Sequence, residues 1–318
     1  MMKNKRLQSN LLLLLTAIIW GSAFVAQSVA MDSLGTFTFN AVRSFVAGLA
    51  LLPVVYFMAR ARKKRGEPVP ESAPGGMRQL ILGGILCGVI LTVASALQQL
   101  GIEYGINVGK AGFLTALYII IVPLLGIFLK KRVHYTIWIS VVLALFGMYL
   151  LCIKEGLRME TRDLLEVACA FCYSLHILVI DHFSKKVDCV KMSCIQFFVS
   201  GVLAGSVALF SEGFTAPVVL LGAWLPILYS GVLSSGAGYT LQMIAQKHTS
   251  PAMASLLMSL ESVFAALAGW LLLSQRLTTK EFIGCVIMFA AILLAQTPDF
   301  LASRRAKATG AQSCCPED

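Results

Sequence analysis

Ten apolar stretches, each long enough to span a membrane, occupy most of this 318-residue chain. The hydrocarbon core of a bilayer takes about 20 apolar residues per helix, so ten spans leave only short connections between them. The sequence therefore predicts an all-α integral membrane protein without a separate soluble domain. The expected transmembrane helices are 11–30, 34–58, 79–102, 110–129, 134–153, 164–182, 192–211, 221–245, 250–274 and 281–297.

The distribution of positive charge predicts how the chain is oriented. If the N-terminus is cytoplasmic, 19 of the Lys and Arg residues fall on the cytoplasmic side and 6 on the outer side. Cytoplasmic loops of membrane proteins carry an excess of these residues, so the net charge of +10 reflects topology and gives no reason to expect nucleic acid as a partner. Both termini are expected in the cytoplasm, with 298–318 as a disordered tail.

The first span is expected to remain in the protein. It follows a basic start, as a signal peptide does, and Ser28-Val29-Ala30 resembles a cleavage site. Its charge-free run from Leu7 to Met31 is nevertheless long for the apolar region of a signal peptide. We therefore count it as the first transmembrane helix.

The two halves of the chain show the same order of spans. When Leu97-Gln98 is placed on Leu241-Gln242, five spans of the first half fall in step with five of the second. Five is odd, so the second half must enter the bilayer in the opposite sense from the first. Such an inverted repeat is typical of secondary transporters with inward- and outward-facing states. The predicted repeats are 11–153 and 164–297.

Polar residues at helical spacing indicate which spans face a cavity. They occur in the first, third, fourth, sixth, eighth and ninth spans, whereas the fifth and tenth are almost entirely apolar. Polar groups facing lipid are costly, so these six helices are expected around a central cavity. Packing or hydrogen bonding between helices is the alternative role for each residue. The predicted cavity residues are Trp20, Gln98, Tyr118, Tyr173, His176, Tyr239 and Gln242.

Two charges lie inside predicted spans. Arg43, in the second span, is expected to be a structural intramembrane charge or a fixed cation paired within the bundle. Glu261, about 16 Å into the ninth span, is close to the midplane, where burial favours the protonated carboxyl. Glu261 is therefore a candidate for proton coupling or for contact with a cationic group of the substrate, although a hydrogen bond between helices is an alternative.

Several of these residues also carry a resemblance to a known family. Trp20-Gly21-Ser22-Ala23-Phe24, Arg43 with Pro53, Gln98, and the run 250–261 are similar to the EamA family of the drug/metabolite transporter superfamily. The resemblance covers about 11–297 as two tandem repeats. The usual Glu-Pro of the ninth span is here Glu261-Ser262, and the usual Glu-Arg that follows is Gln275-Arg276, with Lys131-Arg132 in the first half.

The resemblance implies a ten-helix permease of the bacterial cytoplasmic (inner) membrane that exports amino acids or other metabolites, with helices 1, 3, 4, 6, 8 and 9 around the substrate. The expected partners are a small-molecule substrate, the lipid bilayer and protons as coupling ion. The aromatic residues suit a small amphipathic solute, such as an apolar or aromatic amino acid, and the absence of an Arg or Lys cluster disfavours phosphate. A multidrug-type efflux carrier, a channel, and a non-transport membrane scaffold or receptor remain as alternatives.

Other function classes lack their sequence signatures. The chain has neither His-Glu-x-x-His nor Gly-x-Ser-x-Gly, and no Gly-x-x-x-x-Gly-Lys loop for a nucleotide. Its nine cysteines include one C-x-x-C, Cys169 to Cys172, without the second pair that a zinc site requires. No enzymatic activity, cofactor or metal is expected.

Overall fold

The structure is a computed structural model that describes the backbone of residues 2–66, 75–106, 108–130, 133–152, 160–161, 163–273 and 278–312. Within these ranges all regular structure is helical, and no β-strand occurs. The helices are α1 (Met2–Met31), α2 (Thr36–Arg65), α3 (Gly76–Glu103), α4 (Val108–Thr115), α5 (Tyr118–Phe128), α6 (Tyr135–Cys152), α7 (Asp163–Phe183), α8 (Cys189–Ser211), α9 (Pro217–Gly222), α10 (Trp224–Leu228), η2 (Tyr229–Tyr239), α11 (Thr240–Gln246), α12 (Pro251–Met258), α13 (Glu261–Leu273) and α14 (Thr279–Gln312).

Among the described residues, eight helical stretches are long and apolar enough to cross a bilayer. A shorter apolar helix, Tyr135–Leu151, accompanies them. The predicted span 221–245 corresponds to Trp224–Gln246, which is helical throughout but passes from α-helix into the π-helix η2 and back. The all-helical membrane fold expected from the sequence is therefore present.

Two predicted spans are each divided into two helices by a tight turn. In 108–128 the turn lies at Ala116 and Leu117, where the Leu117 amide donates to the Leu114 carbonyl at 3.2 Å. In 251–273 it lies at Ser259 and Leu260, where the Leu260 amide donates to the Leu257 carbonyl at 3.3 Å. These three-residue bonds tighten the helix locally, a feature common at functional hinges. The two halves of the chain thus contain the same bend at the same position.

Most helix contacts recur when the two halves are exchanged. The first-half helices α1, α2, α3, α4–α5 and α6 correspond in order to α7, α8, α10–η2–α11, α12–α13 and α14. Helix α3 packs on α7 and α8, and correspondingly η2 packs on α1 and α2. Helix α1 contacts α12 and α13, just as α7 contacts α4 and α5. The pairs α2–α8 and α6–α14 each join a helix to its own counterpart, so the bundle has approximate two-fold symmetry.

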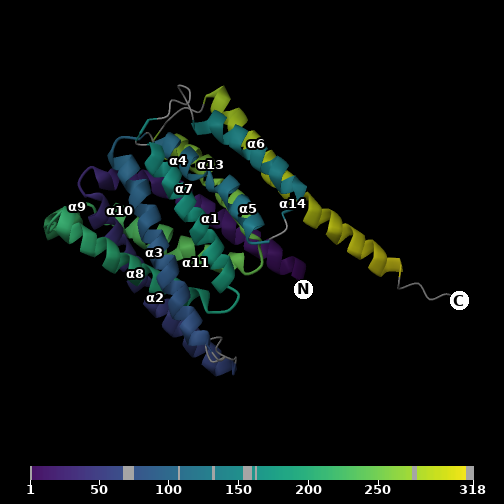
Figure 1. Ribbon diagram of the computed structural model, residues 1–318, viewed down its shortest axis with the longest axis horizontal. Coiled ribbons are helices and arrows are strands. Elements are labelled where there is room, and N and C mark those ends of the chain that lie inside the picture. Colours follow the sequence, from purple (N-terminus) through teal and green to yellow (C-terminus); the bar gives the residue numbers. More distant parts are fainter. Residues whose placement is uncertain are drawn as a thin grey trace.

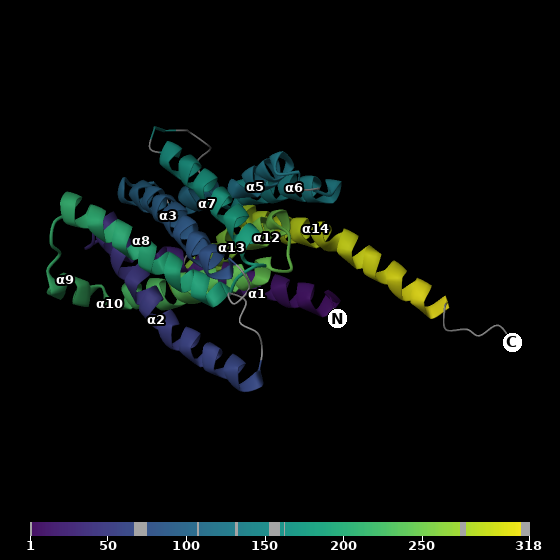
Figure 2. The ribbon, with the colours of Figure 1, turned by 60° about the horizontal axis from the view of Figure 1, so that its bottom comes forward.

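The pair α6–α14 lies along one edge of the bundle, as Figures 1 and 2 show. A Cβ atom added at Gly147 would lie 2.8 Å from the Gly284 carbonyl oxygen, and one added at Gly284 would lie 2.5 Å from that of Gly147. Glycine at both positions therefore allows the two backbones to approach closely, as small residues do in membrane bundles.

The pair α2–α8 is joined at both of its ends. Glu212, directly after α8, accepts hydrogen bonds from the backbone amides of Phe37 and Thr38 at 2.7 and 2.8 Å, at the start of α2. At the opposite end Arg62 of α2 forms a 2.5 Å ion pair with Asp188, which caps the N-terminus of α8. Polar contacts between the halves therefore lie at both ends of this helix pair.

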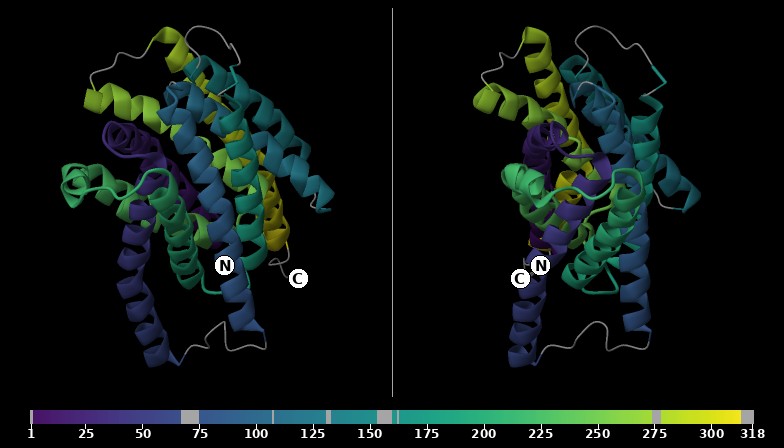
Figure 3. Two further views of the ribbon diagram at one scale, coloured as in Figure 1. Left: turned by 60° about the vertical axis from the view of Figure 1, so that its left-hand side comes forward. Right: turned by 90° about the vertical axis from the view of Figure 1, so that its left-hand side faces the viewer.

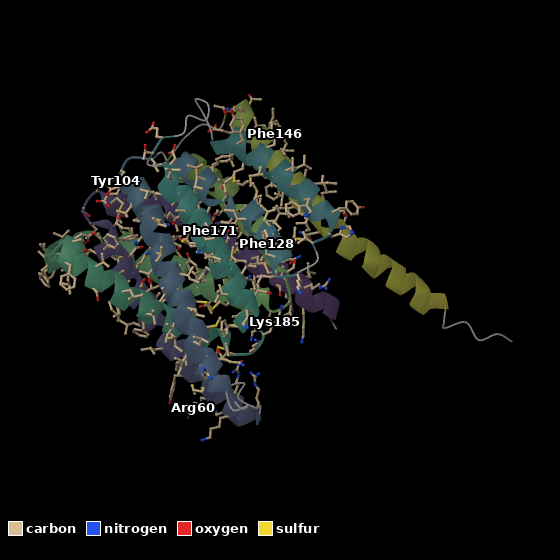
Figure 4. All side chains as sticks on the ribbon, viewed as in Figure 1. Arg60, Tyr104, Phe128, Phe146, Phe171 and Lys185 are labelled. Carbon is tan, nitrogen blue, oxygen red and sulfur yellow. The ribbon has the colours of Figure 1, made fainter. Side chains whose placement is uncertain are left out.

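The two ends of the bundle are distinct. Figure 3 shows the start of α1 and the C-terminal end of α14 toward the same end of the bundle as the end of α2 and the start of α3. Arg60 and Lys185 lie toward this end in Figure 4, and Tyr104 lies toward the opposite end. Many large apolar side chains on the outer surface are exposed, including Phe128, Phe146 and Phe171. In a bilayer these side chains face lipid.

The C-terminal segment differs from the sequence-based expectation. Helix α14 continues past residue 297 to Gln312. The sequence predicts a disordered tail from residue 298 onward. The segment Leu301–Ala308 is rich in Ala and Arg, which have high helix propensity and extend a helix that is already formed. The last predicted tail residues, 313–318, lie outside the described part of the chain.

Candidate functional site

The central cavity is lined by helices from both halves. Each of the six spans that the sequence predicts around a cavity contributes to it, and α2 adds Arg43. All nine site residues named from the sequence line it, including Arg43 and Glu261. The lining residues are Trp20, Phe24, Gln27, Arg43, Gln98, Thr115, Tyr118, Tyr173, His176, Ile177, Ser234, Tyr239, Gln242, Met258 and Glu261.

Glu261 and Tyr118 reach the cavity from the two bent spans. Each is the first residue of the helix that follows its bend, α13 for Glu261 and α5 for Tyr118. The Tyr118 hydroxyl donates a hydrogen bond to Glu261 Oε1 at 3.1 Å, and both side chains are buried. Glu261 also lies in the first turn of α13, where the helix dipole favours negative charge.

Helix α1 crosses α13 directly at Glu261. A Cβ atom added at Gly21 would lie 2.5 Å from the Glu261 carbonyl oxygen and 2.7 Å from Phe264 Cβ. Only glycine therefore permits this crossing, which places Trp20, the preceding residue, at the cavity wall. The sequence Trp20-Gly21 thus has a packing role as well as a lining role.

A chain of hydrogen bonds runs from the cavity to a second buried carboxyl group. The Tyr239 hydroxyl donates to that of Tyr173, which donates to Gln98 Oε1, each at 3.4 Å. Gln98 Nε2 donates to Thr115 Oγ1 at 3.3 Å, and this hydroxyl donates to Glu166 Oε2 at 2.8 Å. Glu166 is fully buried, and its other oxygen packs against Gly101 without a hydrogen-bond partner in the described part of the chain.

Tyr239 is the centre of the aromatic wall. Its ring lies 4.7 Å from that of Trp20, and the rings of His176 and Phe197 approach it edge-on at 5.7 and 5.8 Å. The Trp20 indole donates to the Ser234 carbonyl at 3.0 Å. These contacts hold the large side chains in fixed orientations and leave the Tyr239 ring at the cavity surface.

His176 and Gln242 connect the cavity to neighbouring helices. His176 Nε2 lies 3.1 Å from Gln196 Oε1 of α8, and Gln242 Nε2 donates to Gln246 Oε1 at 3.1 Å. Gln246 in turn donates to the Ile177 carbonyl. Both predicted residues therefore have structural hydrogen bonds in addition to their position at the cavity surface.

Arg43 also lines the cavity. The sequence predicts it as a structural intramembrane charge or a fixed cation paired within the bundle, and does not place it among the cavity residues. Its guanidinium carbon is 5.2 Å from the centre of the Phe39 ring, a cation–π contact on the same helix. Arg43 is buried, with a relative exposure of 7%, and it lines the cavity. The cavity wall therefore includes a guanidinium group, from Arg43, and a carboxyl group, from Glu261.

The set of residues named from the sequence omitted several that line or support the cavity. Thr115 and Gln27 share helical faces with Tyr118 and Trp20, and Glu166 shares a face with Tyr173 and His176. These helical spacings are the sequence feature from which Thr115, Gln27 and Glu166 could have been added to the predicted site. The connection from Thr115 to Glu166 joins α4 to α7, and no spacing within one helix predicts such a contact.

Comparison with known proteins agrees with this architecture. The model of the EamA-like transporter family matches the chain twice, over residues 7–153 and 162–297. An uncharacterized transporter of Archaeoglobus fulgidus is 28% identical over 291 residues, covering 91% of this chain and 86% of that protein. The uncharacterized transporter YoaV of Bacillus subtilis is 20% identical over 286 residues, covering 87% and 92%.

The fold is also similar to that of a protein of known crystal structure. The TM-score is 0.71 at 17% sequence identity, and the match covers 92% of this chain and 97% of the other. At that identity the likeness concerns the fold alone. Because the family match spans both halves of the chain and includes every span that contributes to the cavity, this protein belongs to the EamA-like transporter family, whose members reside in the membrane.

Proposed function

We propose that the protein is a secondary transporter that exports small amphipathic solutes, in the first place amino acids, across the bacterial cytoplasmic membrane. One observation carries the proposal. A central cavity, walled by corresponding helices of both halves, collects aromatic and polar side chains of six spans together with Arg43 and Glu261. Secondary transporters built from repeats bind their substrates at the interface between the repeats, which is where this cavity lies.

The proposed topology has ten transmembrane helices in a 5+5 inverted repeat with both termini cytoplasmic. The symmetric helix contacts support it. The end of the bundle near Arg60 and Lys185 would be cytoplasmic, since it carries the basic residues that the orientation rule expects there. The contacts of Glu212 with α2 would then lie at the outer side.

The two bends offer a mechanism for alternating access. The turns at Ala116-Leu117 and Ser259-Leu260 interrupt the regular α-helical bonding beside the cavity. If α4 and α5, and likewise α12 and α13, change their mutual angle there, one end of the cavity opens while the symmetry-related end closes. The hydrogen bond between Tyr118 and Glu261 joins the two hinges and would couple their movements.

Glu261 is the proposed coupling or substrate-binding group. It lies at the cavity surface beside a hinge, so that occupancy by a proton or by a substrate cation alters the contact with Tyr118. A ligand shifts a conformational equilibrium only through a difference in its interactions with the two states, and the bond between Glu261 and Tyr118 provides one.

Counterflow in proteoliposomes tests the transport function. Purified protein is reconstituted into vesicles that are preloaded with one unlabelled amino acid, and uptake of the same labelled amino acid is followed across a panel that also includes amphipathic cations. A carrier gives transient, saturable accumulation with at least one solute. A channel gives only equilibration, and a scaffold or receptor gives no flux above that of empty vesicles.

Cysteine substitution tests the position of the substrate. A cysteine placed at Trp20, Gln98, Tyr118, Tyr173, Tyr239 or Gln242 is expected to react with a membrane-impermeant thiol reagent, and the transported solute should slow the reaction. A cysteine at Lys64, an exposed residue in the last turn of α2, is the control whose labelling the solute does not change. If all six cavity positions stay unlabelled in both orientations of the protein, the assignment of the substrate site is wrong.

A further inference from the structure

A second cavity, of about 240 Å³, lies at the end of the bundle where α1 starts. Its rim carries side chains that are exposed to solvent, namely Arg6, His134 and His248. Its floor is apolar and includes the buried side chains of Val122 and Met253. Water therefore reaches the rim, whereas the floor suits the apolar part of a small solute.

The second cavity and the central cavity follow one another along the same helices. On α5, Val122 of the second cavity lies one turn beyond Tyr118 of the central cavity. On α7, the neighbouring residues Ile177 and Leu178 line the central and the second cavity, respectively. Helices α1 and α12 also contribute residues to both cavities. The second cavity is thus positioned as an extension of the central one toward this end of the bundle.

Apolar side chains lie between the two cavities. Leu13, Ile119 and Leu257 occupy positions on α1, α5 and α12 between residues of the second cavity and residues of the central one. All three are buried in one apolar cluster, and we refer to them as the apolar plug. The central cavity has a volume of about 40 Å³, which is room for a few water molecules. A solute in the second cavity therefore reaches the central one only when the plug parts.

The equivalent position in the other repeat carries a polar contact instead. Glu166 is the counterpart of Leu13, and Thr115 is the counterpart of Ser259. Thr115 Oγ1 donates to Glu166 at 2.8 Å and so ties α4 to α7. The Ser259 hydroxyl donates to the Leu256 carbonyl of the preceding helix α12, and leucine at position 13 accepts no hydrogen bond. Apolar packing at position 13 is less directional than this bond, so the end with the second cavity can part more readily.

We propose that the second cavity is the vestibule through which the transported solute enters from the cytoplasm, and that the apolar plug is the gate between this vestibule and the central cavity. The inference rests on the proposed transport function and specifies its route of entry. An exporter takes up its solute from the cytoplasmic side, and the rim lies at the end of the bundle proposed to be cytoplasmic. The polar rim and apolar floor match a solute that has a polar group and an apolar part.

Thiol labelling from one side of the membrane tests the route. Ala252→Cys places a thiol in the vestibule wall, and Lys64→Cys, at an exposed position in the last turn of α2, is the control at the same end. A membrane-impermeant maleimide is added to inverted membrane vesicles or to intact cells. Labelling is measured above that of the unchanged chain, which has nine cysteines. Both variants should react in inverted vesicles and not in intact cells, and the solute that shows counterflow should slow only the reaction at position 252.

Blocking the cavity after folding distinguishes a route from a void in the packing. Modification of Ala252→Cys by the maleimide should abolish counterflow, because the attached group fills the vestibule. The same treatment of Lys64→Cys, and of the unchanged chain, should leave counterflow as it is. Met253→Cys, in the same wall, takes the place of Ala252→Cys if the latter yields no folded protein.

A double variant tests the gate. Met258→Cys places a thiol in the central cavity, and Leu13→Ala added to it should speed labelling from the cytoplasmic side, because part of the plug is removed. Leu49→Ala, at a position of α2 that is 58% exposed, is the control that should leave the labelling rate unchanged. Equal labelling rates with and without Leu13→Ala would rule out the plug as the gate.

The outcomes separate this inference from the transport function. If position 252 labels from neither side or only in intact cells, or if counterflow persists after complete modification there, the vestibule assignment is overturned. Counterflow by the unchanged protein still establishes a carrier in that case. If the unchanged protein shows no counterflow with any solute of the panel, the proposed function is wrong, and the route falls with it. Labelling from the cytoplasmic side together with loss of counterflow on modification supports the vestibule.

Discussion

Tyr118 and Glu261 hold corresponding positions in the two halves of the chain and are hydrogen-bonded to each other at 3.1 Å. Each follows a two-residue turn that ends an eight-residue helix, α4 or α12. In a two-fold arrangement, residues at equivalent positions meet when they lie near the symmetry axis. The contact thus places the two bends beside each other at the centre of the bundle, next to the cavity.

Tyr118→Phe is expected to destabilise the protein by about 1–3 kcal/mol, because it removes the donor of a buried hydrogen bond to an acidic group. Thermal unfolding in detergent measures the effect. Tyr149→Phe is the matched control, since no hydrogen bond of the Tyr149 hydroxyl is found in the described part of the chain, where its ring contacts Phe113 and Lys280. Equal stability of the two variants would show that the contact between Tyr118 and Glu261 contributes nothing.

Glu261→Gln is expected to abolish proton-driven accumulation while exchange of substrate persists, because glutamine keeps the shape and hydrogen-bonding capacity of the side chain but does not titrate. Accumulation and counterflow in the same proteoliposome preparation measure the two activities. Glu103→Gln, at an exposed position, is the control. Unchanged accumulation and pH dependence in Glu261→Gln would leave this residue with a structural role or a role in substrate binding.

Gly21→Ala is expected to disturb the crossing of α1 over α13. The added Cβ atom would lie 2.5 Å from the Glu261 carbonyl oxygen and 2.8 Å from the Ala265 amide nitrogen, and overpacking of this kind costs about 1–3 kcal/mol. The measurement is the unfolding temperature together with counterflow. Gly112→Ala serves as control, because nothing lies within 4 Å of the added Cβ atom there. A Gly21→Ala variant as stable as Gly112→Ala would contradict the close approach.

Thr115→Val and Glu166→Gln are expected to be coupled, since Thr115 is the hydrogen-bond donor found for the Glu166 carboxyl group in the described part of the chain. Thr115→Val alone should cost about 1–3 kcal/mol. In the Glu166→Gln background the same substitution should cost less, because the buried acidic group is gone. Thr92→Val, which removes only a bond to the helix's own backbone, is the control. Additive effects in the double-mutant cycle would show that the pair does not interact.

Asp188→Ala is expected to destabilise the end of the bundle near Arg62 more than Arg62→Ala does. Asp188 both caps α8, by accepting from the amides of Val190 and Lys191, and pairs with Arg62. Loss of an N-cap costs about 0.5–2 kcal/mol, whereas a partly exposed ion pair contributes about 0–1 kcal/mol. Urea or thermal unfolding ranks the variants, with the exposed Arg60→Ala as control. The reverse order would mean that the ion pair outweighs the cap.

The sequence by itself determined the class of fold and much of the site. Ten apolar stretches indicated an all-α membrane protein, because unpaired backbone groups are not tolerated in lipid. Polar faces on six spans predicted which helices surround the cavity, since each such face avoids lipid. Trp20, Tyr173 and Tyr239 could be named because helical spacing places them on those faces.

The tertiary structure decided what depends on contacts between helices. Spacing within one helix did not reveal that Tyr118 meets Glu261, that Thr115 links Gln98 to Glu166, or that Arg43 lies at the cavity without a carboxylate partner among the described residues. Nor did it predict the bends at Ala116-Leu117 and Ser259-Leu260, whose residues are compatible with a continuous helix. Periodicity reports which side of a helix is polar, whereas the partner of each polar group depends on how the helices cross, and that is set by packing across the whole bundle.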